Sequence, residues 1–93
     1  MQRTIDFYVS CTNKKYGVEL IINGTKFEAY SDCPDTVQDV YLHLVDEIEA
    51  VYGIALYSHP VENDDILFAM VTARNTLANA ARLFRRVRHD GNL

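Results

Sequence analysis

Five side chains near the C-terminal end of the chain have types and spacing suited to anion binding. They are Arg82, Arg85, Arg86, Arg88 and His89. Four of the five recur at intervals of three and four residues, so a helix would present them on one face. Guanidinium groups form paired hydrogen bonds with the oxygens of a phosphate or a carboxylate. The pattern therefore predicts a surface that holds an anionic group.

Three explanations of these cations remain open. Cations near the C-terminus of a helix stabilise it by about 0.3–1 kcal/mol each, but this role accounts for only one or two of them. They can also pair with the acids of the first predicted helix, within the chain or across a dimer. Those acids are Asp35, Asp39, Asp46 and Glu49. The third explanation is a phosphate-bearing ligand such as a nucleotide or a nucleic acid, although the acidic remainder of the chain repels a polyanion.

Three carboxylates project from one face of the predicted sheet. They are Asp6, Glu19 and Glu28. Glu19 and Glu28 lie directly opposite each other in the predicted register, where like charges destabilise a sheet. This face is a candidate docking site for a basic partner, and the alternative is a solvated face on which Lys26 relieves the repulsion. A metal site is not expected, because the carboxylates lack the spacing of loop-borne calcium ligands.

Covalent, metal and cofactor chemistry have less support. Cys11 points towards the predicted core, and Cys33 begins a predicted helix. A disulfide between them is one alternative, and the other, which the lack of a secretory signal favours, is that both thiols stay reduced. The three histidines lack ligand spacing, no Cys-x-x-Cys motif occurs, and neither a catalytic dyad nor a cofactor fingerprint is present. We therefore expect no enzymatic activity, no cofactor and no bound metal.

The composition is that of an ordinary globular domain. The 93 residues are 48% hydrophobic and 24% charged, with a net charge of −4. This length predicts a single domain over residues 1–93, and the low glycine and proline content argues against disorder. No apolar run is long enough to span a membrane, and Asp6 precedes any apolar segment, which argues against a secretory signal. We expect a cytoplasmic protein with no membrane partner.

The net charge hides an asymmetry between two parts of the chain. Residues 1–70 hold twelve acids and four bases, a net of −8. Residues 71–93 hold five arginines and one acid, a net of +4. Such a division indicates partners of opposite charge, including the other part of the same chain.

Three strands are predicted in the first third of the chain, where apolar and polar side chains alternate. They are residues 4–12, 16–22 and 25–31. Asn23-Gly24 joins the second to the third and is the strongest short signal for a β-hairpin. A two-residue turn places Leu20 opposite Phe27, so the apolar faces of the two strands coincide. The sequence thus predicts an antiparallel meander.

Two helices are predicted after the meander. The first has Asp32 as its cap and Pro34 in its first turn, and it ends at Gly53. The second begins after Asn63 and ends near His89.

Between the helices, residues 54–58 form a possible short fourth strand. The predicted fold class is α+β, a three-stranded antiparallel meander with two helices in the order β-β-β-α-(β)-α.

The apolar residues of the second helix follow a strict 3.5-residue repeat. They are Ile66, Met70, Ala73, Leu77, Ala80, Phe84 and Val87. A strict heptad favours packing of one helix on another, and the alanines would permit close approach. The partner is either the first helix or the same helix of a second copy. In the second case this seam predicts a homodimer.

Part of the chain resembles a known family. The residues that carry the resemblance are Thr12-Asn13, Gly17-Val18, Pro34-Asp35, Asp39-Val40 and Leu44-Val45. Over residues 4–52 this pattern resembles the YoaG family, very small enterobacterial proteins with no assigned function. The resemblance implies a small unit of sheet and helix that pairs with itself, and it implies no activity. The second helix lies outside the resemblance.

The leading hypothesis is a small non-enzymatic interaction or regulatory protein that self-associates, such as an inhibitor of a host or phage protein. The alternative is a binder of a phosphate-bearing ligand, a nucleotide or nucleic acid, through the C-terminal arginines. A third hypothesis is an enzyme that uses Cys33 or the three sheet carboxylates.

Overall fold

The Asn23-Gly24 turn organises an antiparallel sheet. The structure is a computed structural model that describes residues 3–12 and 14–89, without the side chains of Arg88 and His89. Both residues of the turn have a positive φ, 51° for Asn23 and 83° for Gly24. Only glycine and a few polar residues adopt this conformation readily, and a type I′ turn requires it twice. The sheet consists of β1 (Ile5–Cys11), β2 (Tyr16–Ile22) and β3 (Thr25–Ser31), in the order β1-β2-β3. Its register is the predicted one, with Leu20 opposite Phe27.

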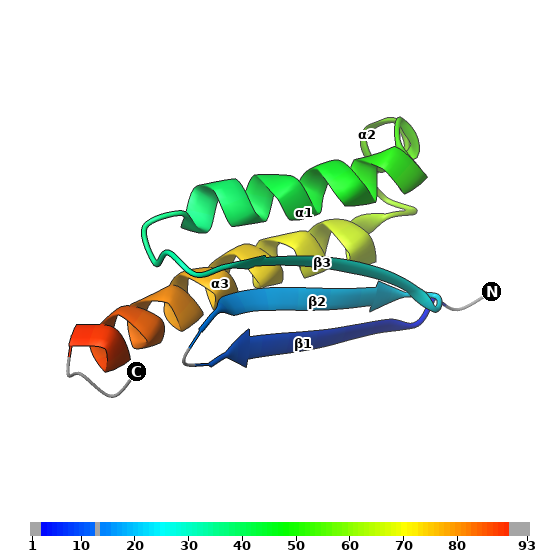
Figure 1. The fold of residues 1–93 in the computed structure, drawn as a ribbon. Coiled ribbons are helices and arrows are strands. Elements are labelled where there is room, and N and C mark those ends of the chain that lie inside the picture. Colours follow the sequence, from blue (N-terminus) through cyan, green and yellow to red (C-terminus); the bar gives the residue numbers. More distant parts are fainter. Residues whose placement is uncertain (1–2, 13, 90–93) are drawn as a thin grey trace.

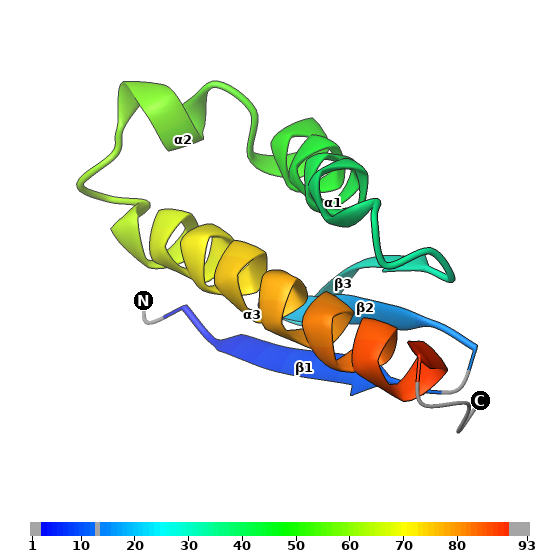
Figure 2. The ribbon, with the colours of Figure 1, turned by 90° about the vertical axis from the view of Figure 1, so that its left-hand side faces the viewer.

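Helices cover one face of this sheet and leave the other face open. α1 (Val37–Tyr52) packs on β3, and α3 (Asp64–His89) packs on β1 and β2. The two helices also contact each other, and α2 (Ala55–Ser58) links their ends. Figures 1 and 2 show both long helices on the same side of the sheet. The chain is therefore an α+β fold, as predicted, with the core between one sheet face and two helices.

The apolar stripe of α3 lies inside this core. Six of its seven residues are at most 5% exposed, and they are Ile66, Met70, Ala73, Leu77, Ala80 and Phe84. Val87 is half-buried. The stripe faces the sheet of its own chain, so it has no surface left for a second copy. The predicted dimer seam is thus wrong as an interface, because the sheet occupies it.

The first helix begins later than predicted. α1 starts at Val37, and Thr36 is its N-cap residue. Pro34 and Asp35 instead form the centre of a turn in which the Thr36 N–H donates to the Cys33 carbonyl over 3.3 Å. Proline suits the second position of such a turn because its φ is already correct. Asp32 therefore precedes the turn and does not cap the helix.

The possible fourth strand, residues 54–58, is helical. The Ser58 N–H donates to the Ile54 carbonyl over 2.8 Å, which closes one α-helical turn. Asn63 is only 5% exposed, and its side-chain amide donates to the carbonyls of Ala55 and His59. These bonds hold the turn against the start of α3. Five residues with one buried side chain, Leu56, do not distinguish a strand from a helical turn by periodicity.

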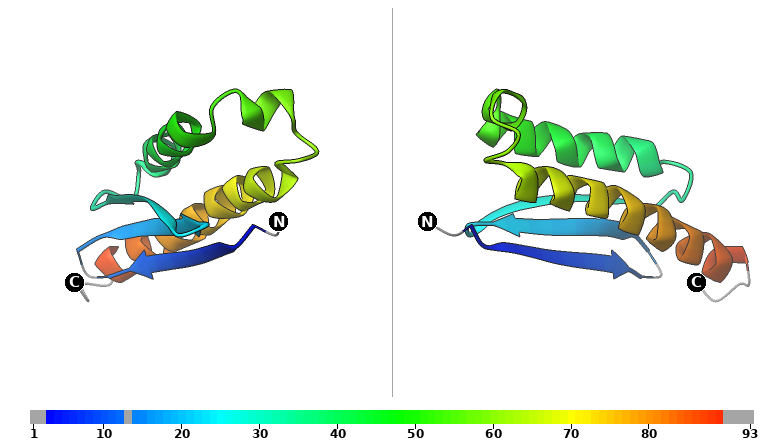
Figure 3. Two further views of the ribbon diagram at one scale, coloured as in Figure 1. Left: turned by 90° about the vertical axis from the view of Figure 1, so that its right-hand side faces the viewer. Right: turned by 180° about the vertical axis from the view of Figure 1, so that it is seen from behind.

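The last turns of α3 extend past the end of the sheet. α3 begins beside Arg3, whose guanidinium contacts Asp65 at 2.8 Å. It reaches the end of β1 at Ala80, whose carbonyl accepts from the Cys11 thiol at 3.6 Å. α3 therefore runs parallel to β1. Figures 1 and 3 show its C-terminal turns projecting beyond the strands.

Replacement of a core residue tests the assignment of the α3 stripe to the interior. Leu77 is fully buried, so Leu77→Ala removes packed methyl groups and leaves a cavity. We expect the free energy of unfolding to fall by about 2–5 kcal/mol in urea titrations at one fixed protein concentration.

Leu42→Ala is the matched control, because Leu42 is 46% exposed on α1. It should lower the free energy of unfolding much less. A folded Leu77→Ala variant that dissociates without loss of stability would contradict this assignment.

Candidate interaction surface

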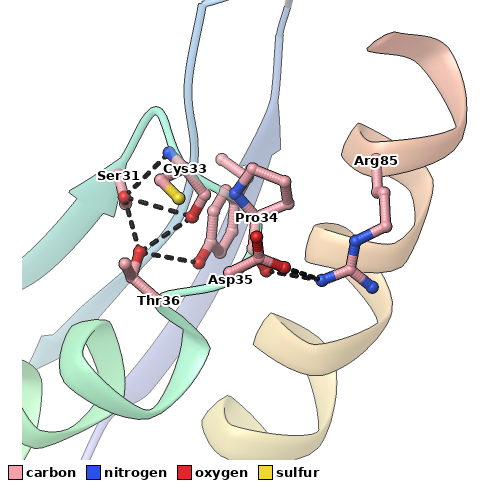
Figure 4. Close-up of polar contacts among 7 residues, drawn as sticks. Ser31, Cys33, Pro34, Asp35, Thr36 and Arg85 are labelled. Atoms are coloured by element: carbon pink, nitrogen blue, oxygen red, sulfur yellow. Dashed lines mark hydrogen bonds and ion pairs between the residues drawn. The ribbon is translucent and has the colours of Figure 1, made fainter. Parts of the chain in front are cut away.

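The arginines predicted to form one anion-binding face have separate roles. Arg85 turns towards α1, and its Nη2 lies 2.6 Å from the Asp35 carboxylate and 3.2 Å from the Pro34 carbonyl (Figure 4). It thus ties the end of α3 to the loop before α1. Both side chains of the ion pair are more than half exposed, so its energy is small, about 0–1 kcal/mol. Of the pairings predicted between the arginines and the acids of the first helix, the structure contains this one, to Asp35.

Hydroxyl groups complete the loop that Arg85 contacts. The Ser31 and Thr36 hydroxyls are 2.7 Å apart, and the Cys33 N–H donates to the Ser31 hydroxyl at 3.0 Å. The Thr36 hydroxyl donates to the Cys33 carbonyl at 2.8 Å and lies 3.4 Å from the Tyr16 hydroxyl. Figure 4 shows this network between β3 and α1. The Cys33 backbone is therefore part of a structural loop, and both cysteines are free thiols.

Arg82 and Arg86 lie on a different side of α3 from Arg85. With Asn79 and Leu83 they line a shallow hollow of about 270 Å³. The Arg82 guanidinium donates to the Asn79 side-chain oxygen at 2.6 Å, which orients it along the helix. The side chains of Arg88 and His89, also predicted for this face, lie outside the described part of the chain. Two arginines and one amide are thus brought together.

The remaining acids of α1 do not pair with these arginines in the described ranges. Glu49 accepts a hydrogen bond of 2.5 Å from the Tyr57 hydroxyl, and this bond raises the pKa of Tyr57. Asp39 and Asp46 have no ion pair to α3 within residues 3–12 and 14–89. Of the four acids predicted to pair with the arginines, only Asp35 does so among the described residues.

The open sheet face carries the predicted acids, and a lysine lies between two of them. Glu19 and Glu28 are directly opposite, as predicted. The Lys26 ammonium lies 3.3 Å from the first carboxylate and 3.5 Å from the second. The hydrogen bond and charge of Glu19, followed by the charge of Glu28, raise the pKa of Lys26. Asp6 has no ion pair with Lys26 among the described residues.

Tyr30 completes the cluster on the open face. Its ring lies over Gly17 and occupies the space that a side chain there would need. Its hydroxyl is 3.5 Å from the Glu19 carboxylate. Burial, and then the charges of Glu19 and Glu28, raise the pKa of Tyr30. Glu19, Glu28 and Lys26 together keep a net charge of −1, so this cluster attracts a basic partner less strongly than the two carboxylates alone would.

Metal binding and membrane insertion find no support in the geometry. Among the described residues, no group of three or more histidine, cysteine, aspartate or glutamate side chains could hold a metal ion. In the same part of the chain, no helix combines the length and apolarity needed to cross a bilayer.

The outer edge of β1 is a surface that the sequence motifs did not reveal. The hydrogen bonds at both ends of the β1–β2 ladder use even-numbered residues of β1: Asn23 N–H to Thr4 carbonyl, and Thr12 N–H to Lys15 carbonyl, each 2.8 Å. Because backbone groups alternate in direction along a strand, odd-numbered residues point away from β2. The N–H and C=O groups of four residues therefore face outwards: Ile5, Phe7, Val9 and Cys11.

An apolar groove runs beside this edge. It has a volume of about 380 Å³ between the start of β1 and the first turns of α3, where Ile5, Phe7 and Phe68 line it beside the Arg3–Asp65 ion pair. Phe68 is 74% exposed and overhangs the groove, and Val9 is 41% exposed on the same strand. We call the outward backbone of β1 together with these four apolar side chains the β1 edge surface. It offers unpaired backbone groups and apolar contact area side by side.

No protein-family model matches the chain, and no curated protein or solved structure is significantly similar to it. The functional argument therefore rests on the geometry of this chain. The sequence predicted the meander and hence that β1 is an edge strand. It did not predict where α3 crosses the sheet, and this crossing creates the groove.

The role of Lys26 can be tested by replacing it with methionine, which keeps the length of the side chain. Lys26→Met leaves Glu19 opposite Glu28 without a cation, so we expect a lower urea midpoint at low salt and partial recovery at high salt. The folded-state pKa of Lys26 is raised, so its stabilising effect is present at neutral pH and is lost as the pH rises through that pKa.

The matched control is Lys26→Met combined with Glu28→Gln, which removes the repulsion and should restore the midpoint. An unchanged midpoint and salt response for Lys26→Met would show that the cluster has no energetic role.

Proposed function

We propose that this chain is a non-enzymatic interaction protein that binds a protein partner through the β1 edge surface. The observation that carries the proposal is a seven-residue edge strand with outward backbone groups next to an exposed apolar groove. Partners bind such edges by adding a strand, in which main-chain hydrogen bonds provide affinity and neighbouring pockets provide specificity. A protein that binds in this way acts by covering a surface of its partner, and such binding can regulate or inhibit the partner.

The contrast between the two edges of the sheet supports the choice of β1. At the β3 edge, the outward N–H of Glu28 donates to the Glu47 carboxylate of α1 at 3.2 Å, and Lys26 adds a charge. Helix contacts and lysines are common means of protecting an edge from pairing. β1 contains neither lysine nor proline, and Asp6 is its only charge. One edge is thus closed and the other is open.

A single substitution on the exposed edge tests this function. Val9→Lys places a charge beside the outward backbone of β1, and lysine at an edge opposes strand addition. The wild-type chain and the variant are immobilised separately. Each is incubated with an extract of the native cells, to which untagged wild-type chain has been added, and the retained proteins are compared. We expect the variant to retain about ten-fold less of the specific partner, the untagged chain included, as measured by mass spectrometry.

Val61→Lys is the matched control, because Val61 is 86% exposed in the segment between α2 and α3. It should behave as the wild type does. If wild type and Val9→Lys retain the same proteins in the same amounts, the β1 edge surface is not the binding site.

The hollow on α3 favours a second candidate function, the binding of a phosphate-bearing ligand. Arg82 and Arg86 present two guanidinium groups at one site, and Asn79 orients the first of them. Charge-assisted hydrogen bonds of this kind contribute about 1.5–3 kcal/mol each. The net charge of −4 opposes a long polyanion, so a small ligand such as a nucleotide suits the site better than a nucleic acid.

Calorimetry with inorganic pyrophosphate tests this second candidate. Arg82→Ala and Arg86→Ala should each weaken binding by about ten-fold or more, because each removes one charged contact. Arg74→Ala, which removes an arginine that lies over the Tyr41 ring elsewhere on α3, should leave binding unchanged. Equal affinities for all three variants would exclude the hollow as a phosphate site.

A further inference from the structure

We infer that the partner at the β1 edge surface is a second copy of this chain, paired antiparallel along β1 about a two-fold axis at Tyr8. The inference rests on the proposed function and names its partner. Two three-stranded sheets would thereby join into one sheet of six strands, which is a common sheet size.

The backbone of β1 suits antiparallel pairing with itself. Residues with outward N–H and C=O groups must lie opposite one another in the new ladder. An axis at Tyr8 places Phe7 opposite Val9 of the second copy, and Ile5 opposite Cys11. All four are outward-facing positions. Tyr8 is the central residue of β1, so this register pairs all seven residues, whereas an axis at either neighbour leaves residues at one end unpaired.

The side chains agree with the same register on both faces of the sheet. On the helix side, Phe7 meets Val9 of the second copy, so the apolar core would continue from one chain to the other. On the open side, the two Tyr8 rings are adjacent, and each is 54% exposed in the single chain. Aromatic and aromatic–aliphatic pairs contribute about 0.2–1 kcal/mol each to a sheet.

Charge disfavours the neighbouring register with its axis at Phe7. Asp6 is the single charged residue of β1, and it lies opposite Ser10 of the second copy. The two aspartates are then offset by four residues, about 14 Å along the strands at ~3.4 Å per residue. An axis at Phe7 would halve this offset and bring the carboxylates closer together. The Tyr8 axis therefore combines complete pairing of β1 with a wide separation of the two aspartates.

The position of α3 makes the helices of the two copies compatible neighbours. α3 lies over both β1 and β2 of its own chain. With strands spaced about 4.8 Å apart, the two α3 axes would be separated by roughly 10 Å, which is the usual distance between packed helices. α3 runs parallel to β1, so the two-fold axis makes the helices antiparallel. Phe68 of each copy would then approach Leu83 of the other.

The side of α3 that faces the second copy is uncharged from Phe68 to Leu83, and Arg86 follows Leu83 at its C-terminal end. Phe68, Thr72, Thr76, Asn79 and Leu83 succeed one another there at helical spacing. The Thr72 and Thr76 hydroxyls donate to the Phe68 and Thr72 carbonyls of their own helix, at 3.0 and 2.7 Å. Their methyl groups are left to face outwards. In a chain with 24% charged residues, this neutral side beside an open strand has the character of an interface core.

Site-directed disulfide formation tests the partner and the register together. Tyr8→Cys is made in a chain with Cys11→Ser and Cys33→Ser, and the protein is oxidised mildly. Opposite residues at a position without ladder hydrogen bonds have Cα atoms about 4.5 Å apart, which suits a disulfide. We expect most of this variant to become a covalent dimer on a non-reducing gel.

Asp6→Cys in the same background is the matched control. It lies on the same face of the same strand, but its copies are offset by four residues, so cross-linking should be at least about ten-fold less. Sedimentation of the wild type at micromolar concentration should give a dimer, and Val9→Lys should give a folded monomer. Equal cross-linking of the two cysteine variants would overturn the register.

Failure of this inference is distinguishable from failure of the proposed function. A wild-type chain that sediments as a monomer, yet still retains another protein through a Val9-dependent contact, would overturn the second copy and leave the β1 edge surface as a binding site. A monomer that retains nothing would overturn both.

Discussion

The packing of α3 across β1 and β2 is the contact on which the other features depend. A three-stranded sheet is about as wide as two helices, so α3 on β1 and β2 leaves α1 the place above β3. This division buries the helix side of β2 and leaves that of β1 only partly covered. The other face is open to solvent, and there Lys26 lies between the Glu19 and Glu28 carboxylates. It also protects the β3 edge, through Glu47 of α1, and leaves the β1 edge open.

The same packing separates cations that are adjacent in the sequence. α3 is longer than the sheet, so its last turns project beyond the strands. Arg85 faces back towards the loop before α1 and contacts Asp35. Arg82 and Arg86 face the other way and share a hollow with Asn79. Residues 1–70 carry a net charge of −8 and residues 71–93 a net charge of +4. Between these two parts of the chain, Arg85 pairs with Asp35, whereas Arg82 and Arg86 remain at the surface.

Local patterns accounted for most of the fold. Asn23-Gly24 has one favourable geometry between alternating strands, so the hairpin and its register followed from the sequence. The apolar repeat of α3, which extends over most of the helix, likewise predicted nearly the observed bounds of this helix. Two shorter features were misjudged. Residues 54–58 contain too few side chains for a period to be recognised, and the cap of α1 is Thr36 because hydroxyl contacts within the Ser31–Thr36 loop decide where the helix begins.

The sequence by itself determined the long helices and strands, the strand register and the apolar side of each of these elements, because these depend on neighbours within a few residues. It did not determine what the α3 stripe packs against. Over 22 residues, a 3.5-residue repeat and a 3.6-residue repeat place almost the same residues on one face of a helix, and a face with either period can pack on a sheet. Only the tertiary structure shows that the apolar stripe of α3 packs against the sheet. The position of α3 in turn decided that β1 keeps a free edge beside an apolar groove, since a groove needs two elements that are 60 residues apart to lie side by side.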